Sequence, residues 1–162
     1  MVILVTGASR GIGKEIARKM AEKGNSVIAN YNKSEKEAEK LQKENDNIEI
    51  YKADVSNRTE VHEMIQNILK KYGKIDVMIN NAGISEEKMF IDVTDEDWNK
   101  VINTNLYSVF CAIQEALPNM ISRKQGCIIS LLCGGLLGLH VNVYMLLVRQ
   151  ELMQLLNHWQ KS

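Results

Sequence analysis

Short apolar runs alternate with longer amphipathic segments over residues 1–130 of the chain. The apolar runs predict β-strands at residues 2–5, 26–30, 48–51, 75–80 and 127–129. Segments whose apolar residues recur at helical spacing predict helices at 11–23, 35–44, 57–72 and 95–118. Strands that are apolar throughout need cover on both faces, so the alternation predicts an α/β fold with a doubly wound parallel sheet.

Polar residues, glycine and proline stand at the ends of these helices. Ser34, Ser56 and Thr94 are where N-cap side chains are expected, and Thr94 precedes three acidic residues that suit the positive end of a helix. Gly73 follows the third helix, and Pro118 is expected to end the fourth. The helix boundaries are therefore predicted from residue types as well as from periodicity.

The composition is that of an ordinary globular domain, with 45% apolar and 25% charged residues. The 20 basic and 20 acidic side chains cancel, which argues against a nucleic-acid partner. The apolar N-terminus lacks the basic lead-in and cleavage site of a signal peptide, so we expect a cytoplasmic protein that is not bound to a membrane. Cys111, Cys127 and Cys133 lack metal-ligand spacing, so we expect reduced thiols and no metal site.

The last part of the chain has a different composition. Residues 1–130 hold 37 of the 40 charged side chains, 17 Ile and 5 Leu, whereas residues 131–162 hold 3 charged side chains, no Ile and 10 Leu. We therefore divide the chain into an α/β domain at 1–130 and an atypical Leu-rich tail at 131–162, and expect the sheet to be truncated after its fifth strand.

A glycine-rich segment at residues 6–13 lies between the first strand and the first helix. Glycines at this place permit a tight turn and let the backbone approach a pyrophosphate, while the start of the helix offers free N–H groups and positive dipole. The segment therefore predicts a dinucleotide site, and the domain is predicted to be of the Rossmann type.

The T-G-x-x-x-G-x-G spacing of residues 6–13, with Asn-Asn-Ala-Gly at 80–83, resembles the short-chain dehydrogenase/reductase family. Residues 54–55 and 104–106 make the chain most similar to the 3-oxoacyl-acyl-carrier-protein reductase branch. The resemblance implies an NAD(P)-binding domain at 1–130, reduction of a carbonyl on a small or carrier-bound substrate, and homo-oligomers in intact relatives. It implies that Asp54 binds the adenine and that Asn105 supports a water of the proton relay. The cofactor-binding positions expected on these grounds are Thr6, Gly7, Ser9, Arg10, Gly11, Ile12, Gly13, Asn30, Asp54, Val55, Asn81, Ala82 and Gly83.

The charges near the second strand bear on which cofactor is used. NAD-selective folds commonly end this strand with a carboxylate that binds the ribose 2′-hydroxyl and repels a 2′-phosphate. Residues 29–33 contain no carboxylate, and Arg10 and Lys33 could pair with a phosphate. We therefore predict NADP(H), the alternative being that both cations are only solvated surface charges.

The catalytic residues that the resemblance implies are missing. Family members carry a Ser on the fifth strand, then a Tyr that protonates the substrate oxygen and a Lys four residues after it. The counted positions of the Ser and the Tyr here hold Cys133 and Leu146. Tyr144 has Val148 where the Lys is needed, so we interpret Tyr144 as non-catalytic and the chain as an impaired fragment. Catalysis by Tyr144 in a rearranged loop stays open as an alternative.

A shifted reading frame would explain the tail. Codons built from the third base of one residue and the first two bases of the next can encode Tyr-Ala-Ala-Ser-Lys from Tyr144 onward, and Met153–Gln154 and Trp159–Gln160 must each encode Ala. We therefore expect residues from about 131 to be out of frame. The alternatives are a weak membrane-spanning segment or an amphipathic helix within a non-catalytic nucleotide-binding or protein-interaction module.

Overall fold

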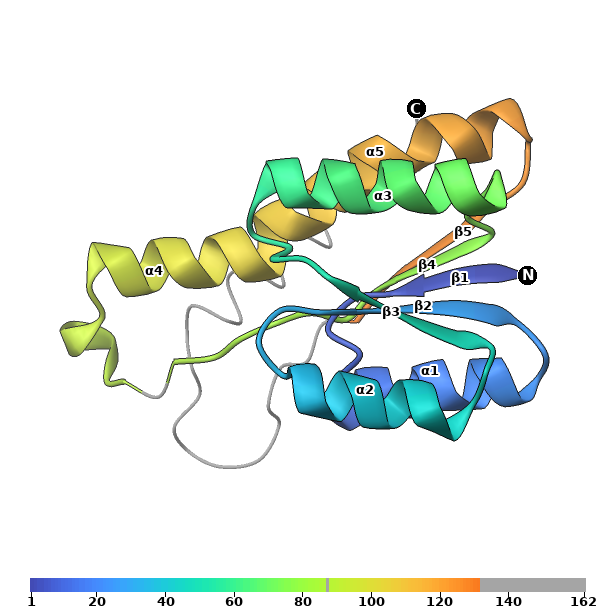
Figure 1. Ribbon diagram of the computed structural model, residues 1–162. Helices are drawn as coiled ribbons and strands as arrows, with labels where there is room; N and C mark the ends of the chain where they lie inside the picture. The colour runs from blue at the N-terminus through green and yellow to red at the C-terminus, as the bar shows by residue number, and fades with distance from the viewer. Residues whose placement is uncertain (87, 132–162) are drawn as a thin grey trace.

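The computed structural model describes residues 1–86 and 88–131, which form a five-stranded parallel sheet with helices on both faces (Figure 1). The strands are β1 Val2–Val5, β2 Ser26–Tyr31, β3 Ile48–Lys52, β4 Val77–Asn80 and β5 Cys127–Ser130. Their order is β3-β2-β1-β4-β5, so the chain reverses direction across the sheet between β3 and β4. The predicted strands and the doubly wound parallel sheet are confirmed.

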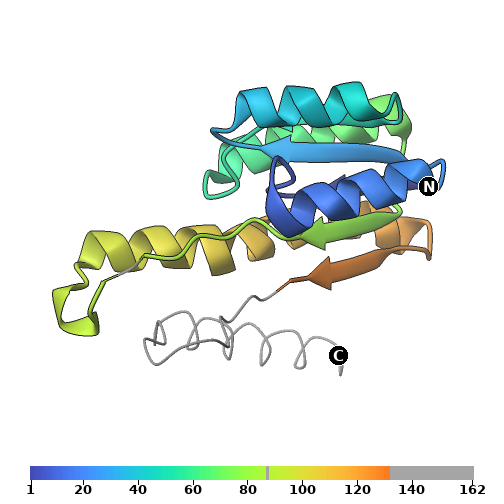
Figure 2. The ribbon, with the colours of Figure 1, turned by 90° about the horizontal axis from the view of Figure 1, so that it is seen from below.

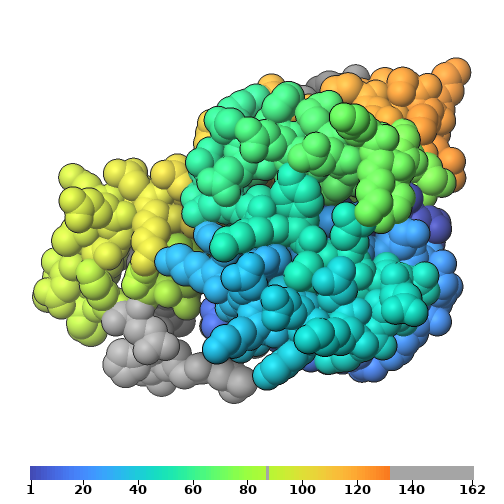
Figure 3. Space-filling view, viewed as in Figure 1, coloured from blue at the N-terminus to red at the C-terminus, as the bar shows by residue number. Residues whose placement is uncertain are grey.

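The helices form one layer on each face of the sheet (Figures 1 and 2). Helices α1 (Gly11–Glu22) and α2 (Glu35–Glu44) cover one face, and α3 (Arg58–Tyr72) and α5 (Ser108–Ser122) cover the other. Helix α4 (Asp95–Ile102) and the 3-10 turn η1 (Phe90–Asp92) stand to one side of this body (Figure 3). The Rossmann-type layering leaves the carboxyl ends of the strands at one edge of the sheet, where ligands of such folds bind.

The central strand explains why the apolar runs are continuous. Val2 and Leu4 belong to the core between the sheet and α3/α5, whereas Ile3 and Val5 belong to the core on the α1/α2 side. All four side chains are buried, because successive residues of a strand point to opposite faces. A strand buried on both faces has no polar alternation, as the sequence indicated.

Two predicted helix boundaries are wrong. Asn57, not Ser56, is the N-cap of α3, and its side chain accepts the Thr59 N–H at 3.0 Å, because Ser56 already hydrogen bonds to Asp54. The predicted helix from Thr94 to Pro118 is instead α4, the single π-helical turn η2 (Asn103–Tyr107) and α5, which continues past Pro118 to Ser122. The burial of the Met120 side chain stabilises that last turn despite the proline.

Asp76 joins three segments at the amino end of the sheet. Its carboxylate accepts the Val2 N–H at 2.9 Å and forms ion pairs with Lys74 at 3.0 Å and Arg123 at 2.9 Å. Burial alone would raise the pKa of this carboxyl, but the hydrogen bond from Val2 and the contacts with Lys74 and Arg123 outweigh it and lower the pKa to about 2. The ionised form of Asp76 is therefore the form that the folded state favours.

Replacing Asp76 by Asn should make folding less sensitive to acid. The folded pKa lies below the ordinary value of 3.8, so the stabilisation is fully present above pH 4 and is lost as the pH falls toward 2. The difference corresponds to about 2 kcal/mol at neutral pH. Urea unfolding of Asp76→Asn should show this loss near pH 7 and a smaller loss near pH 2. An equal loss at both pH values would contradict it.

Within residues 1–86 and 88–131, no helix has the length and apolar character needed to span a bilayer. The charge-free stretch considered as a membrane segment, 131–148, lies outside these residues except for Leu131.

Candidate cofactor site

The glycine turn follows β1 at the carboxyl edge of the sheet. Gly7 and Gly11 have φ of +62° and +58°, a backbone conformation that L side chains rarely adopt. A Cβ on Gly7 would lie 2.8 Å from the Cα of Ala82, and a Cβ on Gly13 would lie 2.3 Å from Nδ2 of Asn81. The predicted glycines therefore serve two needs, which are positive φ at Gly7 and Gly11 and close approach to the end of β4 at Gly7 and Gly13.

Thr6 and Asn81 bind the glycine turn to the end of β4. Oγ1 of Thr6 accepts the N–H groups of Asn81 and Ala82, both at 3.0 Å. The Asn81 amide donates in return to the carbonyl oxygens of Thr6 at 2.9 Å and Gly7 at 3.1 Å. The sequence predicts Thr6, Asn81 and Ala82 as cofactor-binding positions, and in the structure these residues also shape the turn itself.

Asn30 holds the turn from the other side. Its side chain is buried, with Oδ1 3.3 Å from the Gly7 nitrogen that donates to it, and Nδ2 donates to the carbonyl oxygens of Tyr51 at 3.3 Å and Ala53 at 3.0 Å. Asn30 thus joins the ends of β1, β2 and β3. Its amide is occupied by protein groups, and through its Oδ1 it positions Gly7.

Asp54 lies in the loop after β3, and Val55 beside it is buried. The Asp54 carboxylate accepts the Ser56 hydroxyl at 2.6 Å and the Ser56 N–H at 2.9 Å. Burial raises the pKa of Asp54, but the Ser56 hydrogen bonds, assisted by Asn32 and Lys33, outweigh burial and lower it. An ionised, oriented carboxylate is therefore available at this edge to accept a hydrogen bond from an exocyclic amine.

Gly83, which follows β4, lies close to Asn105. The Asn105 side chain, buried in the π-helical turn η2, accepts the Ile84 N–H at 2.9 Å and donates to the Ile84 carbonyl at 2.8 Å. A Cβ on Gly83 would lie 3.4 Å from Oδ1 of Asn105. Asn105 therefore fixes the chain just after the Asn-Asn-Ala-Gly segment.

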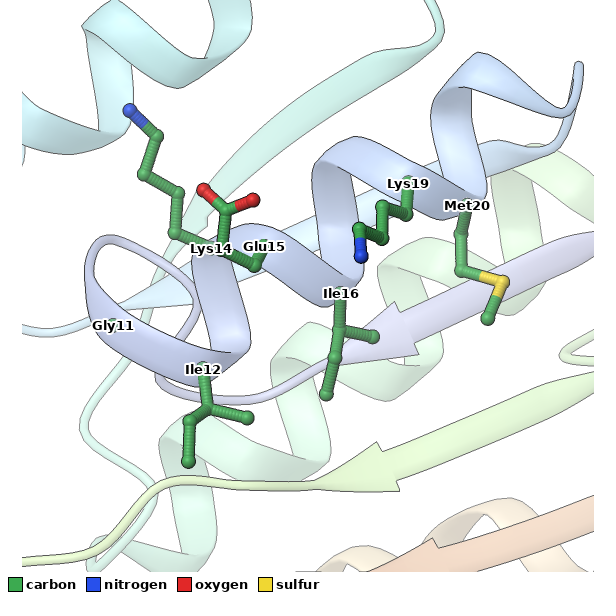
Figure 4. A pocket seen from close by; sticks show the side chains of 7 residues that line it. All are labelled: Gly11, Ile12, Lys14, Glu15, Ile16, Lys19 and Met20. Carbon is green, nitrogen blue, oxygen red and sulfur yellow. The ribbon is translucent and has the colours of Figure 1, made fainter.

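The other predicted residues of the turn differ in exposure. Ser9 is buried, while Arg10, at the N-cap of α1, is exposed and Ile12 is 55% exposed. A hollow of about 570 Å³ runs along α1 and is lined mainly by aliphatic groups such as Ile12, Ile16 and Met20 (Figure 4). This hollow begins at Gly11 and Ile12 of the glycine turn and extends along α1 as far as Met20, so it adjoins the candidate cofactor site.

The sequence did not predict one carboxylate that lies at this edge. The Tyr31 hydroxyl donates to Oε1 of Glu35 at 3.1 Å, which places a negative charge beside the end of β2. Residues 29–33 hold no carboxylate, as the sequence indicated, but the first turn of α2 brings one back. Only three residues separate Tyr31 from Glu35, and this short connection between strand and helix was the signal that could have revealed the contact.

The predicted positions of the missing catalytic groups lie outside the described residues. They are Cys133 and Leu146, and the rejected candidate Tyr144 with Val148 lies outside the described residues as well. Among the described cysteines, Cys111 is buried and Cys127 exposed, and both are free thiols. No group of three metal-ligating side chains occurs among residues 1–86 and 88–131.

The amino-acid sequence of this chain is similar to those of known proteins. The family model described as short chain dehydrogenase matches residues 1–135. The 3-oxoacyl-[acyl-carrier-protein] reductase FabG of Staphylococcus epidermidis is 41% identical over 132 residues, which are 79% of this chain and 54% of that protein. The chain therefore spans about half the length of this curated relative.

Solved structures resemble the chain over most of its length. A metagenomic short-chain oxidoreductase in complex with NADP has a TM-score of 0.86 at 27% identity, covering 98% of this chain and 74% of its own. Serine dehydrogenase from Escherichia coli has a TM-score of 0.80 at 32% identity, covering 96% and 74%. With the family match, the parallel sheet and the glycine turn, these likenesses show that the chain belongs to the short-chain dehydrogenase family.

Proposed function

We propose that the chain binds NADP(H) at the carboxyl edge of the sheet and derives from a reductase of 3-oxoacyl thioesters on a carrier protein. The observation that carries the proposal is the glycine turn that Thr6, Asn30 and Asn81 hold at the start of α1. A bound nicotinamide would supply hydride, while the residues of this turn would bind its pyrophosphate. The names of the similar reductase and of the NADP complex support the proposal.

The site fits a dinucleotide in two respects. The space beside Gly11 is open, since a Cβ there would meet nothing within 4 Å. The ionised Asp54 carboxylate lies at the same edge as the turn and suits an adenine amine. The partners that we propose for the pyrophosphate and the adenine lie at the ends of β1 and β3, which agrees with the usual binding edge of a Rossmann-type domain.

We assign NADP rather than NAD on the basis of two exposed cations. Arg10 precedes α1 and Lys33 precedes α2, and both side chains are available to a 2′-phosphate. The double variant Arg10→Ala/Lys33→Ala should lower NADPH affinity about tenfold and leave NADH affinity little changed. Fluorescence titration with both nucleotides measures this difference.

A matched control for that variant removes a charge elsewhere. Lys19 is exposed on α1, away from the glycine turn, so Lys19→Ala should leave both affinities unchanged. Equal binding of NADH and NADPH by the unmodified chain would contradict the assignment of NADP.

We further propose that turnover is impaired, since the counted Tyr and Lys positions of the family hold Leu146 and Gln150 in this sequence. The reading-frame hypothesis for residues 131–162 accounts for that loss. Sequencing the DNA across codons 125 to 150 tests it, because the shifted frame must contain the Tyr-Ala-Ala-Ser-Lys codons. Other codon choices there would contradict the hypothesis.

A further inference from the structure

The Tyr31–Glu35 hydrogen bond lies where the proposed site would meet the cofactor ribose. Tyr31 is the last residue of β2 and is buried, whereas Glu35 is the first residue of α2 and is exposed. The 3.1 Å contact joins the phenol oxygen of Tyr31 to Oε1 of Glu35. A strand end that lacks a carboxylate in sequence therefore has one close to it in space.

The pair is arranged so that the hydroxyl is the donor. Burial, together with the hydrogen bond to Glu35, raises the pKa of Tyr31, so the phenol keeps its proton at neutral pH. The buried ring leaves the hydroxyl little freedom, and the backbone N–H of Glu35 donates to the Lys33 carbonyl at 3.1 Å. Glu35 is thus fixed at two points. The Tyr31 hydroxyl binds its side-chain carboxylate, and the Lys33 carbonyl binds its backbone N–H.

Charges of both signs lie near this point, and, after burial, the carboxylates of Glu35 and Glu39 both contribute to the raised pKa of Tyr31. Arg10 and Lys33 are the cations proposed to meet a 2′-phosphate, but Lys33 also lowers the pKa of Asp54 and so is shared with that carboxylate. Where the attraction of a cation is divided in this way, the distance of a neighbouring carboxylate changes how strongly a phosphate is bound. A free Glu35 side chain could bind ribose hydroxyls, as acidic residues of NAD-selective sites do, and would repel a phosphate.

We infer that Tyr31 determines nucleotide specificity as a positioning residue: its hydroxyl holds the Glu35 carboxylate on α2 and keeps this charge from the place of a 2′-phosphate. The inference rests on the proposed NADP-binding function. It explains how a site with a carboxylate in the first turn of α2 accepts a nucleotide that carries an additional phosphate. Tyr31 acts through Glu35 and need not touch the cofactor.

Tyr31→Phe tests this in the full-length chain, because it removes the hydroxyl and keeps the buried ring. Titrations with NADPH and NADH should show that NADPH affinity falls about fivefold while NADH affinity is unchanged or rises. Adding Glu35→Gln to Tyr31→Phe should restore NADPH affinity, since the released side chain then carries no charge. Circular dichroism and the thermal midpoint show whether each variant is folded.

Two matched controls isolate the effect. Tyr72→Phe removes another phenol–carboxylate hydrogen bond, the 2.6 Å contact with Glu49 near the amino ends of the strands, and should leave both affinities unchanged. Glu37→Gln removes a second charge from the first turn of α2 and should not rescue Tyr31→Phe.

The possible outcomes distinguish a failure of this inference from a failure of the proposed NADP-binding function. Equal losses for both nucleotides, no loss for either, or failure of Glu35→Gln to rescue would overturn the role of Tyr31 while leaving NADP binding intact. If the unmodified chain bound neither nucleotide, the proposed function would fall, and the inference with it.

Discussion

Gly13→Ala should abolish saturable NADPH binding. The new Cβ would lie 2.3 Å from Nδ2 of Asn81, 2.7 Å from the Gly7 carbonyl oxygen and 3.1 Å from the Cα of Ala8. Either Asn81 leaves, which breaks its hydrogen bonds to the Thr6 and Gly7 carbonyls, or α1 moves away from the turn. Both changes displace the N–H groups proposed to bind the pyrophosphate.

The same change should destabilise the fold by about 1–3 kcal/mol, the usual cost of overpacking or of lost buried hydrogen bonds. Urea unfolding measures this cost, and fluorescence titration measures NADPH binding. Gly11→Ala is the matched control, since its Cβ would meet nothing within 4 Å and only its φ of +58° is strained. Gly11→Ala should therefore weaken binding less than Gly13→Ala. Unchanged NADPH binding in a folded Gly13→Ala variant would refute this account of the turn.

Reduction of a 3-oxoacyl thioester by NADPH should be slower by about two to four orders of magnitude than in a complete reductase, the typical effect of losing a general acid. Asn105, the proposed relay residue, keeps its place beside Gly83, but under the proposed loss of the Tyr such a relay would lack a proton donor. NADPH oxidation followed by absorbance, with the Staphylococcus epidermidis reductase as a positive control, measures the deficit.

Tyr144→Phe distinguishes an impaired enzyme from a rearranged one. Under the proposed function, the residual rate stays the same in this variant, because Tyr144 has no Lys four residues after it. A substantial rate that disappears in Tyr144→Phe would instead identify Tyr144 as the proton donor.

Local pattern was sufficient to predict the sheet and the glycine turn. The burial of β1 on both faces produces an uninterrupted apolar run, and positive φ at Gly7 and Gly11 needs a residue type that is visible in the sequence. Both signals lie within a few neighbouring residues, so they can be recognised before the fold is known.

Features that depend on contacts between distant segments could not be predicted in this way. The hydroxyl of Thr6 accepts hydrogen bonds from residues more than 70 positions away, and the Asn30 amide joins three strand ends. Ser56 is a good cap by type, but Asp54 binds its hydroxyl, so the cap is Asn57. The continuation of α5 beyond Pro118 likewise depends on the tertiary burial of Met120.

The central claim is that this chain holds a nicotinamide dinucleotide at the carboxyl edge of its sheet. Equilibrium titration of the full-length chain with NADPH, followed by fluorescence, tests it most directly. We expect NADPH to bind saturably at one site per chain. NADP⁺ should displace the bound NADPH, and NADH should bind only weakly. A folded chain that shows no saturable signal with NADPH would contradict the claim.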